Sequence, residues 1–158
     1  LFGFGLGDLS FRGGGGLAES LSQLAAGLGI ADRVTFLGAR PHGDILAELR
    51  QSHVFILPSL TGQDGDQEGV PVSIMEAMAA GLPVVVSRVS DVASPLEDGK
   101  SALLVDPLRP DQIATAVISL IENPKLYSEI AAYGQKIVRD QFTLENYAKA
   151  ILMAPENP

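Results

Sequence analysis

The sequence predicts an α/β domain in which helices cover both faces of a doubly wound parallel sheet. Short apolar runs alternate with longer segments of helical apolar spacing along most of the 158 residues. The run 54–57 is wholly apolar and stops at Pro58, which is typical of a buried strand. The segment 71–80 has Pro71 in its first turn and Gly81 just past its end, as expected of a helix.

The first elements follow from local composition. Residues 1–5 are apolar and glycine-spaced, and we expect a short strand that enters a loop. Four consecutive glycines, Gly13–Gly16, are costly to order and predict a flexible joint. Residues 17–28 carry apolar side chains at helical spacing, and Gly29 can end that helix. A strand over 34–37 comes next.

The remaining elements repeat this alternation. Thr143 is a favourable cap for the last helix, which we expect to close the domain over 143–152. The length suits one domain, residues 1–158. Parallel sheets of this class bind ligands beyond the carboxyl ends of their strands. The expected elements after residue 37 are helices over 44–51, 71–80, 110–121, 124–140 and 144–152, and strands over 54–57, 83–86 and 102–105.

Composition excludes several functions. Hydrophobic residues make up 46% and charged residues 19%, which indicates a compact domain and not a disordered chain. The absence of cysteine excludes disulfides and thiolate metal sites, and it fits a cytoplasmic protein. A net charge of −8 with no run of Lys or Arg argues against a nucleic-acid partner. A small anion stays possible in principle, because a helix N-terminus can bind phosphate.

Two features of the chain bear on its surroundings. The apolar stretch 68–88 is broken by Gly81 and Pro83, so we expect no transmembrane segment there. The chain begins at Leu1 without a Met or a basic leader, and we expect it to be part of a longer protein.

The segment 68–78 has the chemistry of a ligand site. It joins the carboxyl end of an apolar strand to an apolar helix, and Gly69 leaves backbone N–H groups free for a phosphate. Glu76 is the only charged residue in that helix, and a lone buried carboxylate is costly unless it is hydrogen-bonded. The hydroxyls of a ribose or pyranose could supply the donors, or an internal Arg or backbone amides could. Glu68 precedes the helix, where favourable interaction with the helix dipole usually explains an acidic residue, so it is the weaker signal of the two.

Glu68, seven further residues and Glu76 resemble the E-x7-E signature of family-4-type GT-B glycosyltransferases, the glycosyl transferases of group 1. The resemblance continues through residues 77–85 and reappears at 32–38, 98–105 and 142–145, so it covers about residues 30 to 152 in order. Ala102 stands where that family usually has glycine. The chain is therefore similar to the Rossmann-like, donor-binding C-terminal half of a GT-B enzyme.

The resemblance implies roles for the two carboxylates. Glu76 would bind the ribose hydroxyls of the donor nucleotide. Glu68 would contact the hydroxyls of the donor sugar and is the candidate catalytic residue.

The same resemblance implies that backbone groups line the rest of the donor. Gly69, Val70 and Pro71 would line the sugar and diphosphate, and Arg40 would flank the base. The family's diphosphate-binding Arg and Lys would precede Leu1. Residues 2–8 are loosely similar to its glycine loop, and the tract Gly13–Gly16 is foreign to it.

The activity implied is transfer of a hexose, with retention, from a nucleotide diphosphate sugar to a glycan or lipid-linked acceptor. No cofactor and no metal are expected, because backbone dipoles and basic side chains stabilise the leaving diphosphate. A missing N-terminal GT-B domain would bring the acceptor site, so we expect no turnover from the chain alone. The full-length enzyme would be cytoplasmic, or peripheral at the inner membrane face.

Other readings stay open beside this one. A nucleotide-sugar epimerase can share the architecture, and the chain can be a nucleotide-binding module without activity of its own. The two histidines lack the spacing of a metal site. We expect His53, at the start of an apolar strand, to be packed, and His42 to approach the base or to face solvent.

Overall fold

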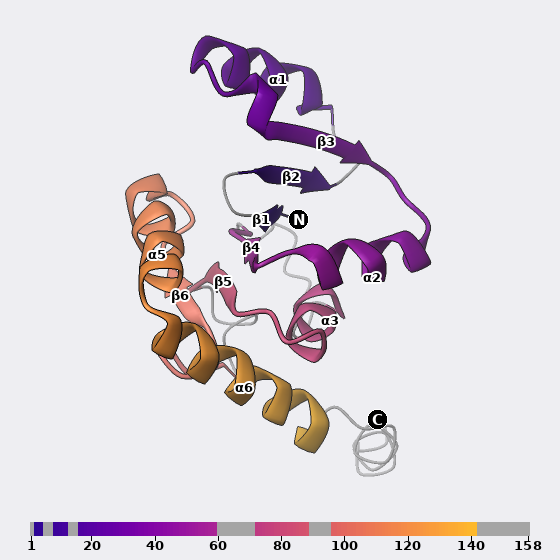
Figure 1. Cartoon of the computed structure of the whole chain (residues 1–158). Helices are drawn as coiled ribbons and strands as arrows, with labels where there is room; N and C mark the ends of the chain where they lie inside the picture. The colour runs from indigo at the N-terminus through magenta and orange to yellow at the C-terminus, as the bar shows by residue number, and fades with distance from the viewer. Residues whose placement is uncertain (1, 5–7, 13–15, 60–71, 89–95, 142–158) are drawn as a thin grey trace, which may run out of the picture.

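The computed structural model describes residues 2–4, 8–12, 16–59, 72–88 and 96–141. Figure 1 shows a single twisted sheet with helices on either side. The predicted closing helix over 143–152 lies outside the described residues.

In the described residues the sheet has six strands in the order β3-β2-β1-β4-β5-β6, which is a strand order of doubly wound folds. The pairs β2–β3, β4–β5 and β5–β6 are parallel, and β1 is antiparallel to both of its neighbours. The α/β doubly wound class is thus confirmed, with β1 as a departure from an all-parallel sheet. The strands are β1 (Phe2–Phe4), β2 (Leu9–Arg12), β3 (Val34–Gly38), β4 (Val54–Leu57), β5 (Val84–Ser87) and β6 (Leu103–Val105).

The direction of β1 has a simple cause. Only residues 5–8 join β1 to β2, whereas a parallel neighbour needs a crossover of a dozen or more residues. The strand predicted over residues 1–5 therefore exists, but it pairs as the first arm of a hairpin, with Phe2 opposite Phe11.

Strand β2 was not predicted, and it changes the interpretation of the glycine tract. Residues 13–17 connect the carboxyl end of β2 to α1, and β2 is parallel to β3. The tract Gly13–Gly16 therefore lies in the strand-to-helix connection of a β–α–β unit. Of residues 2–8, which are loosely similar to the family's glycine loop, residues 2–4 form strand β1.

The described helices match the predicted segments to within two residues at each end. Pro and Gly signals near several helix ends explain the agreement at these boundaries. The helices are α1 (Ala18–Gly27), α2 (His42–Gln51), α3 (Val72–Ala79), α5 (Pro110–Glu122) and α6 (Pro124–Gln141), with one 3₁₀ turn at Ala31–Arg33.

Two hydrophobic cores lie on opposite faces of the sheet. Alternate residues of one strand enter different cores: Phe55 packs with α2 and α3, whereas Val54 and Ile56 pack with α5. Helix α6 runs along the sheet beside both groups of helices (Figure 1). It contributes Ile130 to the α5 core and Ile137 to the α2–α3 core.

Candidate functional site

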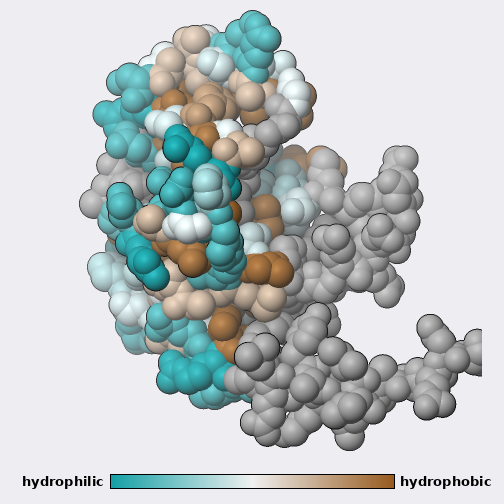
Figure 2. Space-filling model, turned by 90° about the vertical axis from the view of Figure 1, so that its right-hand side faces the viewer, coloured by the Kyte–Doolittle hydropathy of each residue, from teal (hydrophilic) through white to brown (hydrophobic). Residues whose placement is uncertain are grey.

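The carboxyl ends of the parallel strands form the edge where a ligand is expected. The β3 arrow points to the right in Figure 1, and Figure 2 views the molecule from that side. The described surface there is a mixture of hydrophilic and apolar residues (Figure 2). Residues 39–41 after β3, the segment after β4 and Arg88 after β5 lead out from this edge.

Glu76 is held on α3 at the boundary between core and solvent. Ile74, Ala77 and Met78 of that helix are buried, whereas Val72 is 64% exposed. The side chain of Glu76 is 18% exposed. The helix is therefore buried on one side and exposed on the other, and Glu76 lies between the two. A carboxylate is tolerated at this boundary because it keeps part of its contact with water.

The partner of Glu76 comes from the neighbouring helix. His42, the first residue of α2, places its Nε2 3.4 Å from Oε1 of Glu76. Among the residues that the structure describes, neither an Arg side chain nor a backbone amide takes this place. The side chain of His42 is itself 66% exposed. Local pattern could not predict this contact, because 34 positions separate the two residues.

Arg40 lies on the same connection as His42 but bends back onto β3. Its Nε donates a hydrogen bond to the carbonyl oxygen of Leu37 at 3.0 Å. The side chain lines a cavity of about 130 Å³ together with Leu37, Asp44 and Glu48. The structure thus places Arg40 at the predicted connection, and its contact with a base stays a prediction.

The other four predicted site residues, Glu68, Gly69, Val70 and Pro71, lie outside the described residues. The residues that can be placed are Glu76 and Arg40. Both follow carboxyl ends of parallel strands, as the fold class predicts.

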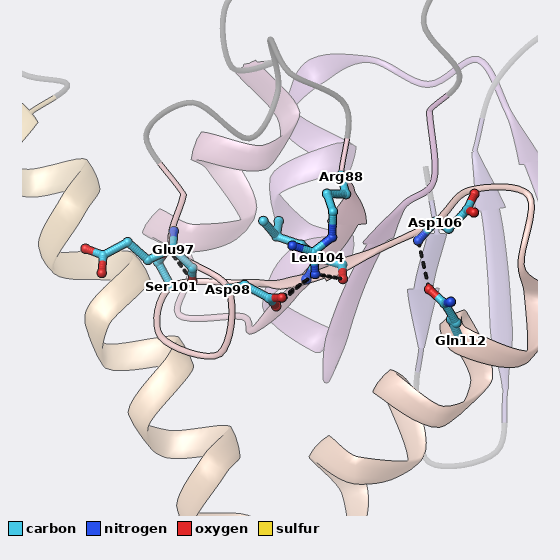
Figure 3. A network of polar contacts seen from close by, with 7 residues as sticks. All are labelled: Arg88, Glu97, Asp98, Ser101, Leu104, Asp106 and Gln112. Carbon is cyan, nitrogen blue, oxygen red and sulfur yellow. Dashed lines mark hydrogen bonds and ion pairs between the residues drawn. The ribbon is translucent and has the colours of Figure 1, made fainter.

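Arg88, which the sequence analysis did not single out, ties the neighbouring strands together (Figure 3). Its Nη2 donates to Asp98 and, at 3.1 Å, to the carbonyl oxygen of Leu104. Asp98 also accepts a hydrogen bond from the backbone N–H of Leu104 at 2.9 Å. The guanidinium therefore fixes the turn that begins at Asp98 against β6.

That turn explains how the family's usual glycine can be replaced. Gly99 has φ +74°, and its N–H donates to the carbonyl oxygen of Ala102 at 2.9 Å. Ala102 is fully buried, and no non-glycine residue in the described part of the chain has positive φ. Ala at 102 therefore needs no left-handed backbone. The Ser101 hydroxyl accepts from the N–H of Glu97 at 2.8 Å and closes the turn (Figure 3).

A hydrogen bond from Lys100 holds the pKa of Glu97 below its ordinary value, and a second one from the Tyr133 hydroxyl acts in the same direction. These groups are exposed and lie on the turn and α6. Their effect is local to the turn.

His53 is exposed, so the expectation that it is packed is wrong. It precedes β4 at the amino end of the strand and lines an apolar cavity of about 230 Å³ with residues of α5 and α6. Burial at this cavity raises the pKa of the Tyr127 hydroxyl. The cavity is remote from the carboxyl edge, because the amino and carboxyl ends of parallel strands lie on opposite sides of the sheet.

Within the described ranges, no three His, Asp or Glu side chains gather as metal ligands would. No helix in the same ranges has the length and apolar character to cross a membrane.

The family of this chain follows from its sequence over most of its length. Residues 8–137 match the family described as glycosyl transferases group 1. The chain belongs to this family. The expected enzyme family, and the Rossmann-like fold of a GT-B domain, are thereby confirmed.

Individual group 1 relatives agree with the match. The chain is 39% identical over 113 residues to the putative colanic acid biosynthesis glycosyltransferase WcaL of Salmonella typhimurium, covering 70% of this chain and 28% of WcaL. It is 33% identical to a GDP-mannose-dependent phosphatidylinositol monomannoside mannosyltransferase of Mycolicibacterium smegmatis, covering 85% of this chain and 35% of the enzyme.

Solved structures show the same fold. HepE of Anabaena, crystallised with UDP, aligns with a TM-score of 0.79 at 25% identity, over 93% of this chain and 40% of HepE. WaaG, a glycosyltransferase of lipopolysaccharide biosynthesis, aligns with a TM-score of 0.70 at 20% identity. The chain thus spans roughly a third of the length of these group 1 proteins.

Proposed function

We propose that this chain binds the nucleotide of a nucleotide-sugar donor, as the donor domain of a retaining group 1 glycosyltransferase. The observation that carries the proposal is the Glu76 carboxylate, which is 18% exposed at the carboxyl edge of the sheet. A carboxylate accepts hydrogen bonds only, so it suits the paired hydroxyls of a ribose. The match to HepE, which was crystallised with UDP, supports a nucleotide as the ligand.

The remaining roles complete the donor site. Glu68 contacts the sugar, the backbone of Gly69, Val70 and Pro71 lines the sugar and diphosphate, and Arg40 flanks the base. Transfer of a hexose proceeds without a metal, since backbone dipoles and basic groups stabilise the diphosphate.

The acceptor is a glycan or a lipid-linked glycoconjugate, bound by an N-terminal GT-B domain. The names of the relatives support this proposal: one is assigned to colanic acid and another to a phosphatidylinositol mannoside. A lipid-linked acceptor would place the full-length enzyme at the inner membrane face.

The test is a calorimetric binding panel of UDP, GDP, ADP and their sugars against the protein and its Glu76→Gln variant. We expect one nucleotide series to bind and the variant to bind it about 10- to 100-fold more weakly. Hydrogen bonds to a charged group contribute about 1.5–3 kcal/mol, and each 1.4 kcal/mol is about a factor of ten.

Glu122→Gln is the matched control, because Glu122 is exposed at the far end of α5. It should bind nucleotide as the unmodified protein does. If no nucleotide bound, or if Glu76→Gln and Glu122→Gln bound alike, the ribose assignment would fail.

A further inference from the structure

Glu76 needs a restraint from outside its own helix. Val72 lies four residues before it on α3, and Ala80 lies four residues after it, just past the end of the helix. Both are apolar and exposed, so neither side chain offers the carboxylate a hydrogen-bond donor. Ser73, three residues before it, forms no hydrogen bond with Glu76 among the described contacts. A free glutamate has several rotamers, and ordering it on ligand binding has an entropic cost.

That restraint comes from α2. His42 Nε2 lies 3.4 Å from Glu76 Oε1, and it is the one ion-pair partner of Glu76 in the described part of the chain. The imidazole can present an N–H at Nε2 both as the neutral tautomer and as the imidazolium. Because His42 is the first residue of α2, the positive end of that helix dipole acts on the carboxylate in the same sense.

The distance is as informative as the pairing. A full charge-assisted N–H···O bond spans about 2.7–2.9 Å, so the contact of 3.4 Å does not saturate the carboxylate. The oxygens stay available to hydroxyls that approach from the solvent side. His42 therefore orients the Glu76 carboxylate and leaves its oxygens available to the ribose hydroxyls.

We infer that His42 is a positioning residue, which holds the Glu76 carboxylate in place for the ribose hydroxyls of a nucleoside diphosphate. The inference rests on the proposed function and deepens it. The 66% exposure of the His42 side chain means that its removal opens no cavity in the core. Its loss should therefore act on ribose recognition and leave folding intact.

The experiment compares UDP and GDP with their 2′,3′-dideoxy analogues by calorimetry, in the full chain and its variants. We expect the unmodified protein to prefer the ribonucleotide to its dideoxy analogue. In His42→Ala the ribonucleotide should bind about 2- to 5-fold more weakly, as expected for one partly exposed ion-pair contact, while the affinity for the dideoxy analogue stays the same. His42→Gln keeps an N–H donor of similar reach and should restore most of the preference.

His53→Ala is the matched control, since His53 is also exposed but lies at the opposite edge of the sheet. Thermal unfolding by circular dichroism checks that all variants fold. If His42→Ala keeps the full ribose preference, the inference is overturned and the ribose role of Glu76 stands. If the unmodified protein shows no ribose preference, the proposed function fails and the inference falls with it.

Discussion

At the residue scale, Gly81 is the clearest case of a side chain dictated by backbone geometry. It follows α3 with φ +83°. Its N–H donates to the carbonyl oxygen of Met78 and the N–H of Leu82 to that of Ala77, each at 3.0 Å, which is a Schellman motif. This turn directs the chain from the helix of Glu76 into β5.

Gly81→Ala should therefore destabilise the protein. The left-handed backbone costs a non-glycine residue about 1–2 kcal/mol, and the new Cβ would lie 2.9 Å from Nε2 of Gln135. Urea unfolding should show that the free energy of unfolding falls by about 1–2 kcal/mol. Gly27→Ala is the control, since Gly27 is helical and a Cβ built there would meet nothing within 4 Å. This variant should be more stable by about 0.5–1 kcal/mol. Equal effects at both positions would contradict the explanation.

His42 and Glu76 show how far residue-level prediction from sequence reaches. The position of Glu76 on a helix after a buried strand followed from local pattern, whereas its role in ribose binding is what the family resemblance of residues 68–76 implies and stays a prediction. The contact with His42 did not follow, because it depends on how α2 and α3 pack across the edge of the sheet. Local periodicity contains no information on that packing.

At the element scale, the approach of α6 to α3 depends on a small residue. A Cβ built on Gly134 would lie 3.1 Å from Cε and 3.4 Å from Cγ of Met78, which is tighter than ordinary van der Waals contact. A side chain at this position would therefore require Met78 to shift, and a branched side chain would require a larger shift than a methyl group. Through this contact α6 supports the helix on which Glu76 stands.

Gly134→Val should push the two helices apart. Overpacking of a core contact costs about 1–3 kcal/mol, whereas helix propensity alone would change little. Ala132→Val is the matched control, because Ala132 is exposed on the same helix and should lose only a few tenths of a kcal/mol, roughly. Chemical denaturation of both variants measures the difference. Similar losses in both would mean that the α3–α6 contact is loose.

The predicted and missed elements differ in the range of the interactions that make them. Helices α5 and α6 have 13 and 18 residues of local apolar periodicity, so their positions followed from the sequence. Strand β2 has four residues of weak pattern beside a glycine tract, and it exists because Leu9 and Phe11 pair with Val34 and Phe36. The direction of β1 likewise depends on pairing.

At the scale of the whole molecule, one sheet separates two cores that are connected through shared strands. Ile74 belongs to the α2–α3 core and Leu120 to the α5 core, and both are almost completely buried. Neighbouring residues of β4 and β5 support opposite cores. We therefore expect the two cores to unfold together, because the same strands support both.

Ile74→Ala and Leu120→Ala should each lower the free energy of unfolding by about 2–5 kcal/mol, within one cooperative transition. Far-UV circular dichroism and tyrosine fluorescence should give coincident melting curves for both. Ile118→Ala, at a position 50% exposed on α5, is the control and should have a small effect. Separate transitions for the two probes would show that the cores unfold independently.

The central place of β1 has a mechanical consequence. Between β2 and β4 the hydrogen-bonded continuity of the sheet passes through three residues, Phe2–Phe4, each paired on both sides. A tension applied across the strands concentrates on that short seam. Apart from this seam, strands β2 and β3 are joined to strands β4, β5 and β6 by the chain that runs from β3 through α2 to β4. Helix α2 begins at His42. Shear at the seam would therefore load α2, which carries both His42 and the buried Leu49 of the α2–α3 core.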